Sequence, residues 1–335
     1  MKGNIIVGQS GGPTAAINSS LAGVYRTAID RGAKKVYGMR HGIQGLLNED
    51  YIDLSEHIQT DLDVELLKRT PAAYLGSCRY KLPEIHEDIA TYDKIFSILD
   101  KLEIECFIYI GGNDSMDTIK KLSDYAILRG HPTKFLGVPK TIDNDLALTD
   151  HTPGYGSAAK YIGTSVKEII QDSQALIYDK GLVTIVEIMG RNAGWLVGAA
   201  ALSKGEDCDG PDLIYVPELP FDIDNFLVRI KELLTEKTFV VVAVSEGIRL
   251  ADGRYVCELT DGVDFVDAFG HKQLTGTANY LARRLAQEIG CKTRTIELSS
   301  MQRAASHLAS RIDILEAFQV GGAAVKAADE GDTGE

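Results

Sequence analysis

The sequence has no long hydrophobic run, few cysteines and no excess of basic residues, and each absence excludes a class of protein. No apolar stretch approaches the ~20 residues that a membrane-spanning helix needs, so we expect no membrane contact. The five cysteines are odd in number, widely spaced and without a CxxC pair, which favours reduced intracellular thiols over a disulfide framework or a zinc site. Acidic residues outnumber basic ones by 48 to 35, which argues against a general nucleic-acid-binding surface.

A charged and apolar leader is also absent, because the chain enters the apolar stretch Asn4-Ile5-Ile6-Val7 at once. We therefore expect no secretory signal and a cytoplasmic location. The chain has 335 residues, of which 44% are hydrophobic, and this length is enough for a large core. Length and composition together predict a soluble globular protein with two domains.

Short apolar runs alternate with longer helical patterns along the whole sequence. Continuous runs of Val, Ile and Leu indicate strands that are buried on both faces, and their alternation with helices predicts parallel sheets. We therefore predict a doubly wound α/β fold. The small and polar residues 327–335 are expected to fray. The predicted strands are residues 5–7, 36–39, 106–110, 135–138, 183–186, 213–216 and 239–244, and the predicted helices are 14–31, 114–129, 192–203, 224–235 and 277–289.

Glycine-rich segments follow two of the predicted strands, where ligands of such folds collect. In IGGNDSMDT (110–118), a glycine turn at Gly112 leads into the helix expected from Asp114, and a helix start after a glycine turn favours an anion such as phosphate. Two carboxylates, Asp114 and Asp117, lie at the same helix start. In GQSGGPTAAIN (8–18), Gly11 and Gly12 would let a phosphate approach the backbone, although an ordinary tight turn explains them equally well. The spacing matches neither the dinucleotide-binding pattern nor the P-loop.

The segment PKTIDNDL (139–146) concentrates reactive side chains after another predicted strand. A hydroxyl nucleophile needs a base within reach, and phosphoryl transfer needs cations near the developing charge. Asp143 is the candidate base, Asp145 the candidate Mg²⁺ ligand and Lys140 the candidate phosphate clamp. The alternative is an Asx turn, but the lysine and Thr141 are surplus to a turn.

Four arginines are candidates for binding phosphate groups. Arg191 follows a predicted strand in the segment MGRNAGW, and its planar guanidinium suits a phosphoryl group. Arg294 and Arg303 flank two serines that include Ser300, and Arg79 lies in LGSCR. Ordinary surface salt bridges are the alternative for all four.

Taken together, these motifs resemble the phosphofructokinase family. The motifs SGGP, LGSCR, GGNDS, PKTIDND, MGRNAG, SEG and MQR occur in the family's order over residues 3–328. The resemblance implies two similar α/β lobes with the active site between them, a donor lobe over 1–140 and a sugar lobe over 141–335, with the chain crossing between lobes. It also implies Mg²⁺-dependent phosphorylation of the 1-hydroxyl of fructose 6-phosphate.

The resemblance further implies a role for each matching position. Asp143 would accept the proton of the sugar hydroxyl, and Arg191 and Lys140 would act on the transferring group. Donor binding is implied for Gly11, Gly12, Arg79, Gly112, Asp114, Ser115 and Lys140; sugar binding for Thr141, Ile142, Asp143, Met189, Gly190, Arg191, Glu246, Arg294, Ser300 and Arg303; and metal binding for Asn113, Asp114 and Asp145.

Two residues predict which donor is used. Family members that use ATP carry glycine at the positions of Asp114 and Lys140, which leaves space for the α-phosphate and the nucleoside. An aspartate fills this space with bulk and negative charge, so it repels ATP. The pair resembles the pyrophosphate-dependent branch, which implies pyrophosphate as donor and a readily reversible reaction.

The sequence departs from the family at three places. Asn113 replaces an aspartate near Mg²⁺, and it offers an oxygen ligand without a charge. Ser299-Ser300-Met301 replaces a glycine and an aromatic residue or histidine, so we expect a relaxed sugar preference that extends to seven-carbon sugar phosphates. The sequence stops soon after Arg303, where family members continue, and we expect it to be truncated or naturally short.

Two other functions stay open at this point. The first is an ATP-dependent 6-phosphofructokinase, and the second is a non-catalytic regulatory subunit that binds a sugar phosphate. The presence of Asp143, Asp145 and Arg191 argues against the second, because a binding module needs no base. A homodimer or homotetramer is expected from the family, with fructose 6-phosphate and pyrophosphate as the small-molecule partners.

Overall fold

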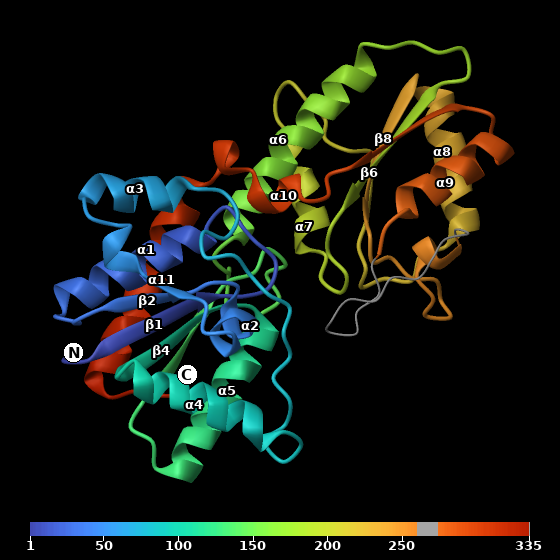
Figure 1. Cartoon of the computed structure of the whole chain (residues 1–335). Coiled ribbons are helices and arrows are strands. Elements are labelled where there is room, and N and C mark those ends of the chain that lie inside the picture. The colour runs from blue at the N-terminus through green and yellow to red at the C-terminus, as the bar shows by residue number, and fades with distance from the viewer. Residues whose placement is uncertain (260–273, 335) are drawn as a thin grey trace.

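Two β-sheets, each flanked by helices, form the two lobes of the computed structural model, which describes residues 1–259 and 274–334 (Figure 1). The first sheet has the strand order β3-β2-β1-β4-β5, and only the edge strand β3 runs antiparallel to its neighbour. The second has the order β7-β8-β6-β9 and is parallel throughout. The first-sheet strands are β1 (Asn4–Gln9), β2 (Val36–Met39), β3 (Tyr51–Asp53), β4 (Ile104–Gly111) and β5 (Lys134–Pro139). The second-sheet strands are β6 (Leu182–Ile188), β7 (Leu213–Tyr215), β8 (Phe239–Ser245) and β9 (Lys292–Glu297).

Helices cover both faces of each sheet, so the predicted doubly wound α/β class with mostly parallel sheets is confirmed. The predicted boundary at residue 140 stays a prediction. The helices are α1 (Ile17–Asp30), α2 (Gly42–Leu47), α3 (Asp61–Arg69), α4 (Ile89–Lys101), α5 (Asn113–Arg129), α6 (Tyr155–Gln174), α7 (Trp195–Gly198), α8 (Ile223–Glu236), α9 (Thr277–Glu288), α10 (Met301–Ala304) and α11 (Arg311–Glu330).

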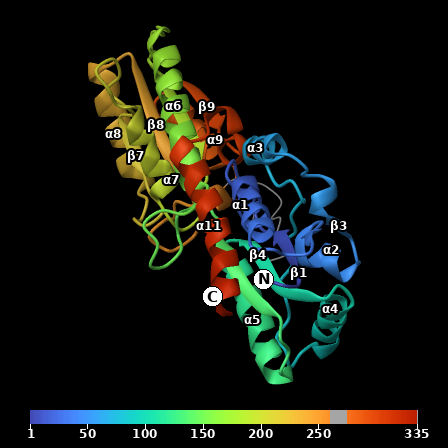
Figure 2. The ribbon, with the colours of Figure 1, turned by 90° about the vertical axis from the view of Figure 1, so that its left-hand side faces the viewer.

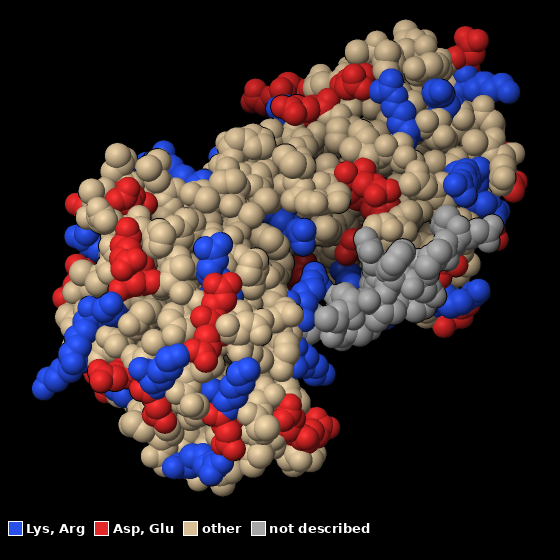
Figure 3. Space-filling view, in the orientation of Figure 1, with Lys and Arg blue, Asp and Glu red and all other residues tan. Residues whose placement is uncertain are grey.

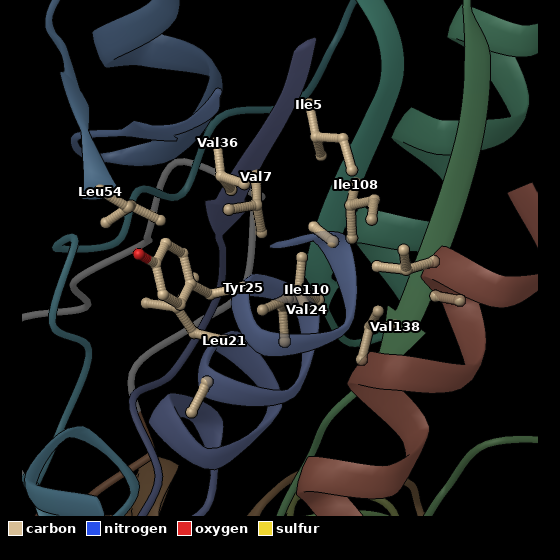
Figure 4. Packing of buried hydrophobic residues seen from close by; sticks show 14 of the residues in the cluster. Ile5, Val7, Leu21, Val24, Tyr25, Val36, Leu54, Ile108, Ile110 and Val138 are labelled. Carbon is tan, nitrogen blue, oxygen red and sulfur yellow. The ribbon is translucent and has the colours of Figure 1, made fainter. Parts of the chain in front are cut away.

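The continuous apolar strands are explained by their two buried faces. Along β1, Ile5 and Val7 enter the core beneath α1, whereas Ile6 enters the core on the opposite face of the sheet. Figure 4 shows the first of these cores, where Leu21 and Val24 of α1 meet the strand side chains. Because side chains alternate along a strand, a strand between two cores must be apolar at every position.

The helix α11 returns from the second lobe and packs against α1 of the first (Figure 2). The two backbones are close because glycines lie at the contact: a Cβ on Gly23 would come 1.9 Å from the carbonyl oxygen of Phe318, and one on Gly321 would come 2.1 Å from that of Ser20. Beyond the helix, the Thr333 hydroxyl accepts a hydrogen bond from Phe135 N. The expectation that residues 327–335 fray is therefore wrong for residues 327–334.

Several further features differ from the sequence prediction, which contained none of the helices α2, α3, α4, α6, α10 and α11. The helix expected over 192–203 is a single turn, α7, followed by a 3₁₀ segment from Ala199 to Ser203. The helix α7 begins three residues later than predicted, after Gly194, whose N–H donates a hydrogen bond of 2.6 Å to the Glu218 carboxylate. The edge strands β3 and β9 were not predicted, because neither contains a continuous apolar run. Within the described ranges, no helix combines the length and apolar character required to cross a bilayer.

Candidate active site

The predicted site segments gather where the carboxyl ends of the two sheets face each other. In the first sheet, β1, β4 and β5 are neighbours, so the three loops that follow them meet at one edge. In the second sheet, the loops after β6 and β8 are likewise adjacent. On the face drawn in Figure 3, basic and acidic side chains both lie in the hollow between the lobes. This position matches the rule that ligands bind outside the carboxyl ends of parallel strands.

The glycine loop after β1 presents its backbone to this hollow. Gly11 has a φ of 74°, which an L side chain adopts only with strain. Its carbonyl accepts a hydrogen bond of 2.5 Å from the Ser77 hydroxyl, and its N–H donates to Cys78 O. A Cβ on Gly12 would lie 3.4 Å from a guanidinium nitrogen of Arg303. Glycine therefore gives this loop its turn at Gly11, and Gly12 lies beside the guanidinium of Arg303.

The start of α5 forms a second wall of the hollow. Gly112 precedes the first turn without a side-chain cap, so first-turn N–H groups and the helix dipole favour an anion at this end. Asp114 is exposed in that turn, whereas Ser115 is buried against Gly111. Asp117, the other carboxylate of the motif, pairs with Lys121 at 2.8 Å. Of the two carboxylates, Asp114 is thus the one that lies exposed in the first turn of α5.

Lys140 lies between the glycine loop and the second lobe. Its side chain is buried, with 3% of the residue exposed, and Nζ donates a hydrogen bond of 2.8 Å to Gly12 O. Burial lowers the pKa of Lys140 to about 8; the nearby carboxylate of Asp143 opposes this shift, and the positive charges of Arg303 and Arg79 add to it. Three cations therefore share one small region, and a bound polyanion would relieve their repulsion.

Asp143 projects from the segment that follows β5. Its backbone N–H donates to the Thr141 hydroxyl at 3.1 Å, and Ile142 anchors the segment in the core of the second lobe. Burial raises the pKa of Asp143 above its ordinary value, and the charge of Asp145 adds to the shift, while Lys140 and the nearby arginines oppose it. A carboxylate with a raised pKa in a cationic site is a better proton acceptor than an exposed one.

Gly190 and Glu246 form the second-lobe side of the site. Gly190 has a φ of 137°, and a Cβ there would come 2.7 Å from Ala193 O. Its N–H donates to a Glu246 carboxylate oxygen at 3.4 Å. Burial raises the pKa of Glu246 to about 7; the Gly190 N–H lowers it, and the charges of Glu187 and Asp143 raise it further. Arg191 follows at the same turn, and its charge opposes the rise.

Arg303 belongs to α10 and joins the two lobes. Its carbonyl accepts a hydrogen bond of 2.8 Å from Ala15 N in the first lobe. Burial lowers the pKa of Arg303, and the charge of Arg79 lowers it further. The neighbouring Gln302 accepts a 3.4 Å hydrogen bond from Met189 N, which ties α10 to the loop after β6. The predicted sugar-phosphate arginine and the predicted donor lysine thus both lie beside Gly12.

Two predicted residues do not join this group. Arg294 lies opposite Thr184 within the second sheet and donates to the Asp172 carboxylate at 2.6 Å, beside α6. Ser300 is exposed at the start of α10. The sugar-binding role expected for Arg294 stays a prediction.

The predicted metal ligands lie partly together. The Asn113 amide donates to the Asp145 carboxylate at 3.2 Å, and both residues are exposed. No three His, Cys, Asp or Glu side chains converge as metal ligands within residues 1–259 and 274–334. Mg²⁺ commonly uses one or two carboxylates and completes its shell with substrate phosphates and water. The negative charge of Asp145 raises the pKa of Asp143, and a bound cation would offset that charge. These residues therefore fit Mg²⁺.

Sequence reasoning missed several residues that support the site. Glu187 is buried behind Glu246 and accepts a 2.8 Å hydrogen bond from Ala278 N at the start of α9. Asn144 and Asp313 are buried and bonded to the backbone near Asp143. A signal existed for Asp313, because Ser310-Arg-Ile-Asp313 has capping-box spacing, but its carboxylate contacts the start of α6 instead.

Glycine loops, clustered cations and a half-buried carboxylate between two α/β sheets suit phosphoryl transfer. This chain belongs to the phosphofructokinase family, because the family profile "Phosphofructokinase" matches residues 4–328.

Individual relatives agree with this assignment. The curated pyrophosphate–fructose 6-phosphate 1-phosphotransferase of Xanthomonas campestris pv. campestris is 43% identical over 329 residues, which are 98% of this chain and 77% of the relative. The crystal structure of a pyrophosphate-dependent phosphofructokinase from Nitrosospira multiformis matches with a TM-score of 0.86 and 33% identity, over 99% of this chain and 78% of that one. One from Marinobacter aquaeolei matches with a TM-score of 0.85 and 37% identity, over 99% and 77%.

Proposed function

We propose that this protein transfers a phosphoryl group reversibly from pyrophosphate to the 1-hydroxyl of fructose 6-phosphate, giving fructose 1,6-bisphosphate. The observation that carries the proposal is the buried Lys140, whose ammonium lies against Gly12 and beside Arg303 and Asp143. This is a compact cationic site for a small polyanion, next to a base. The names of the most similar relatives support the same donor and acceptor.

The residues divide the chemistry between them. Asp143 accepts the proton of the sugar hydroxyl as that oxygen attacks the phosphoryl group. Lys140 and Arg191 stabilise the charge on the transferring group. Asn113, Asp114 and Asp145, together with donor oxygens, hold Mg²⁺. When bound, the cation neutralises charge on the donor phosphates.

Donor and sugar contact opposite sides of this centre. Gly11, Gly12, Gly112, Ser115 and Arg79 surround the donor, and Asp114 excludes a donor that carries a nucleoside. The sugar contacts the Thr141–Ile142 segment, Met189, Gly190 and Glu246, and Arg303 binds its 6-phosphate. Because Arg294 lies away from this group, it acts at the site of a neighbouring copy, with Ser300 at the sugar's edge.

The wider setting follows from the same reading. We propose a homodimer or homotetramer that works in the cytoplasm, with a donor lobe over 1–140 and a sugar lobe over 141–335. The apolar core shared by α1 and α11 means that the boundary is crossed again near residue 311.

The test compares donors directly. Initial rates are measured with fructose 6-phosphate and Mg²⁺, using pyrophosphate in one series and ATP in the other. We expect turnover with pyrophosphate and little with ATP. Preference for ATP would overturn the donor assignment but keep the acceptor. No turnover with either donor, together with retained sugar-phosphate binding in calorimetry, would favour the regulatory-subunit alternative.

A further inference from the structure

We infer that Asn144 and Asp313 are positioning residues that hold Asp143 in place, through a strap formed by residues 150–154. The inference rests on the proposed function, because it takes Asp143 as the base. Neither residue belongs to the donor, sugar or metal groups described above. Both act through backbone groups, and both are buried, with 6% of Asn144 and 3% of Asp313 exposed.

Asn144 turns the chain immediately after the base. Its φ of 55° lies in the left-handed region, which asparagine tolerates better than most residues. This turn lies between Asp143 and Asp145 in the chain. Asn144 Oδ1 accepts a 2.8 Å hydrogen bond from Thr152 N, and Nδ2 donates at 3.1 Å to Asp150 O. The amide thus binds the strap with both of its polar atoms.

The strap also binds the other side of the base. The Thr152 hydroxyl donates to Thr141 O at 2.7 Å, and Thr141 N donates to Pro153 O at 3.2 Å. Asp143 therefore lies between two residues that are each held by the same short stretch. Rotation of its backbone would have to break hydrogen bonds on both sides.

Asp313 fixes the strap to the rest of the molecule. One carboxylate oxygen accepts a 2.8 Å hydrogen bond from Gly154 N, and the other accepts one of 3.0 Å from Ser157 N and one from the Ser157 hydroxyl. The helix that carries Asp313, α11, packs along α1 in the first lobe. The position of Asp143 is therefore fixed relative to the first lobe, which carries the glycine loop, although the segment of Asp143 packs in the second lobe.

Such a chain of contacts affects the chemical step more than binding. A misplacement of about 1 Å can reduce the rate about 100-fold, because the base must meet the hydroxyl in a narrow geometry. The sugar phosphate is held mainly by other groups, so its affinity should change little. A residue that only stabilises the fold would change neither parameter in the molecules that remain folded.

The first experiment uses Asn144→Gly, which keeps the left-handed turn but removes the amide. We expect kcat to fall about 10- to 100-fold, while KM for fructose 6-phosphate changes less than about threefold. The matched control is Asn4→Ala, which removes a buried amide bonded to Leu102 O at the opposite edge of the first sheet. It should leave kcat unchanged. Equal kcat in Asn144→Gly and the parent protein would overturn the inference.

The second experiment uses Asp313→Asn, which keeps the shape but turns an amide donor toward the Ser157 N–H. We expect the same selective loss of kcat. The control is Asp329→Asn, which breaks the ion pair between Asp329 and Arg31. Asp329 belongs to the same helix as Asp313, but it lies at the end far from the strap. If both variants lose kcat equally, Asp313 acts only through helix stability and the inference fails.

Hydrogen exchange separates this inference from the proposed function. In both Asn144→Gly and Asp313→Asn, the amides of residues 141–145, Thr152 and Gly154 should exchange faster, and those of β1 should not. If the parent protein shows no turnover with either donor, the proposed function fails, and exchange alone decides whether the strap holds the segment. Unchanged exchange at 141–145 would refute the strap.

Discussion

The two sides of the site are built from different materials. On the first-lobe side, the contacts come from backbone at Gly11 and Gly12 and from the exposed carboxylate of Asp114. On the second-lobe side, they come from half-buried carboxylates such as Asp143 and Glu246, whose pKa values are raised by desolvation.

The difference indicates how selection and chemistry are divided. A glycine loop admits any compact anion, so the proposal assigns selection on that side to Asp114, which fills the space. Carboxylates with raised pKa values discriminate by protonation state and by hydrogen-bond geometry, so the proposal assigns the chemistry to the other side. Lys140 lies between the two sides of the site, and the proposal gives it a part in both selection and chemistry.

The largest expected effect is on the second-lobe side. Asp143→Asn removes the base but keeps the size of the side chain, so kcat should fall about 10²- to 10⁴-fold. The affinity for fructose 6-phosphate, measured by calorimetry, should stay within a few fold. Asp150→Asn, which alters an exposed carboxylate on the same loop, is the control. Substantial remaining turnover in Asp143→Asn would mean that the base is another group.

The next effect tests the blocking role on the first-lobe side. The double variant Asp114→Gly with Lys140→Gly removes bulk and charge, so the ratio of kcat/KM for ATP to that for pyrophosphate should rise about 100-fold, or about 3 kcal/mol. Asp117→Asn is the control, because its carboxylate lies on the same helix but pairs with Lys121. No gain in ATP use would show that space and charge at these positions do not select the donor.

A smaller effect concerns pH and Glu246. In the proposed site, the ionised carboxylate of Glu246 accepts a hydrogen bond from a sugar hydroxyl. Because the pKa of Glu246 is about 7, this ionised form is lost as pH falls through 7. KM for fructose 6-phosphate should therefore rise up to about tenfold per pH unit below 7, whereas an ordinary glutamate would stay ionised to about pH 5. Glu246→Gln should flatten this dependence. An identical profile in the variant would assign the titration to another group.

The smallest effect concerns stability rather than chemistry. Gly321→Ala places a methyl group 2.1 Å from Ser20 O, so the first lobe should lose about 1–3 kcal/mol of stability. Gly198→Ala has no atom within 4 Å of the added carbon and serves as the control in the second lobe. Thermal unfolding of both variants measures the difference. Equal midpoints would mean that the α1–α11 contact adjusts freely.

The sequence was informative where local pattern determines structure. Strands such as β1 and β4 were predicted because they contain continuous apolar runs, and the glycine loops follow these two strands. The edge strand β9 was missed because five of its six residues, KTRTIE, are polar, so it has no apolar run. Neither the helix α11 nor its packing on the first lobe was predicted, and helical periodicity would not in any case tell which sheet a helix covers.

The same limit applies to the site. Candidate residues were identified one motif at a time, and their order in the chain does not tell which will touch. That Lys140 and Arg303 both lie beside Gly12 depends on the approach of two lobes, which no local pattern encodes. The strap through Asn144 depends equally on a carboxylate from a distant helix.

The position of α11 has a consequence for how the protein is made. Ala324, Val325 and Ala328 of α11 complete the core that β1 and α1 begin. The first sheet is therefore synthesised long before α11, which packs on one of its faces. The second lobe is synthesised between the two. Contacts of such sequence separation slow folding and leave apolar surface open to other chains in the meantime. We expect β1 amides to become protected during refolding no earlier than those of α11, and pulsed hydrogen exchange would contradict this if β1 were protected first. Chaperone dependence should accordingly be greatest for nascent chains that have not yet reached residue 311.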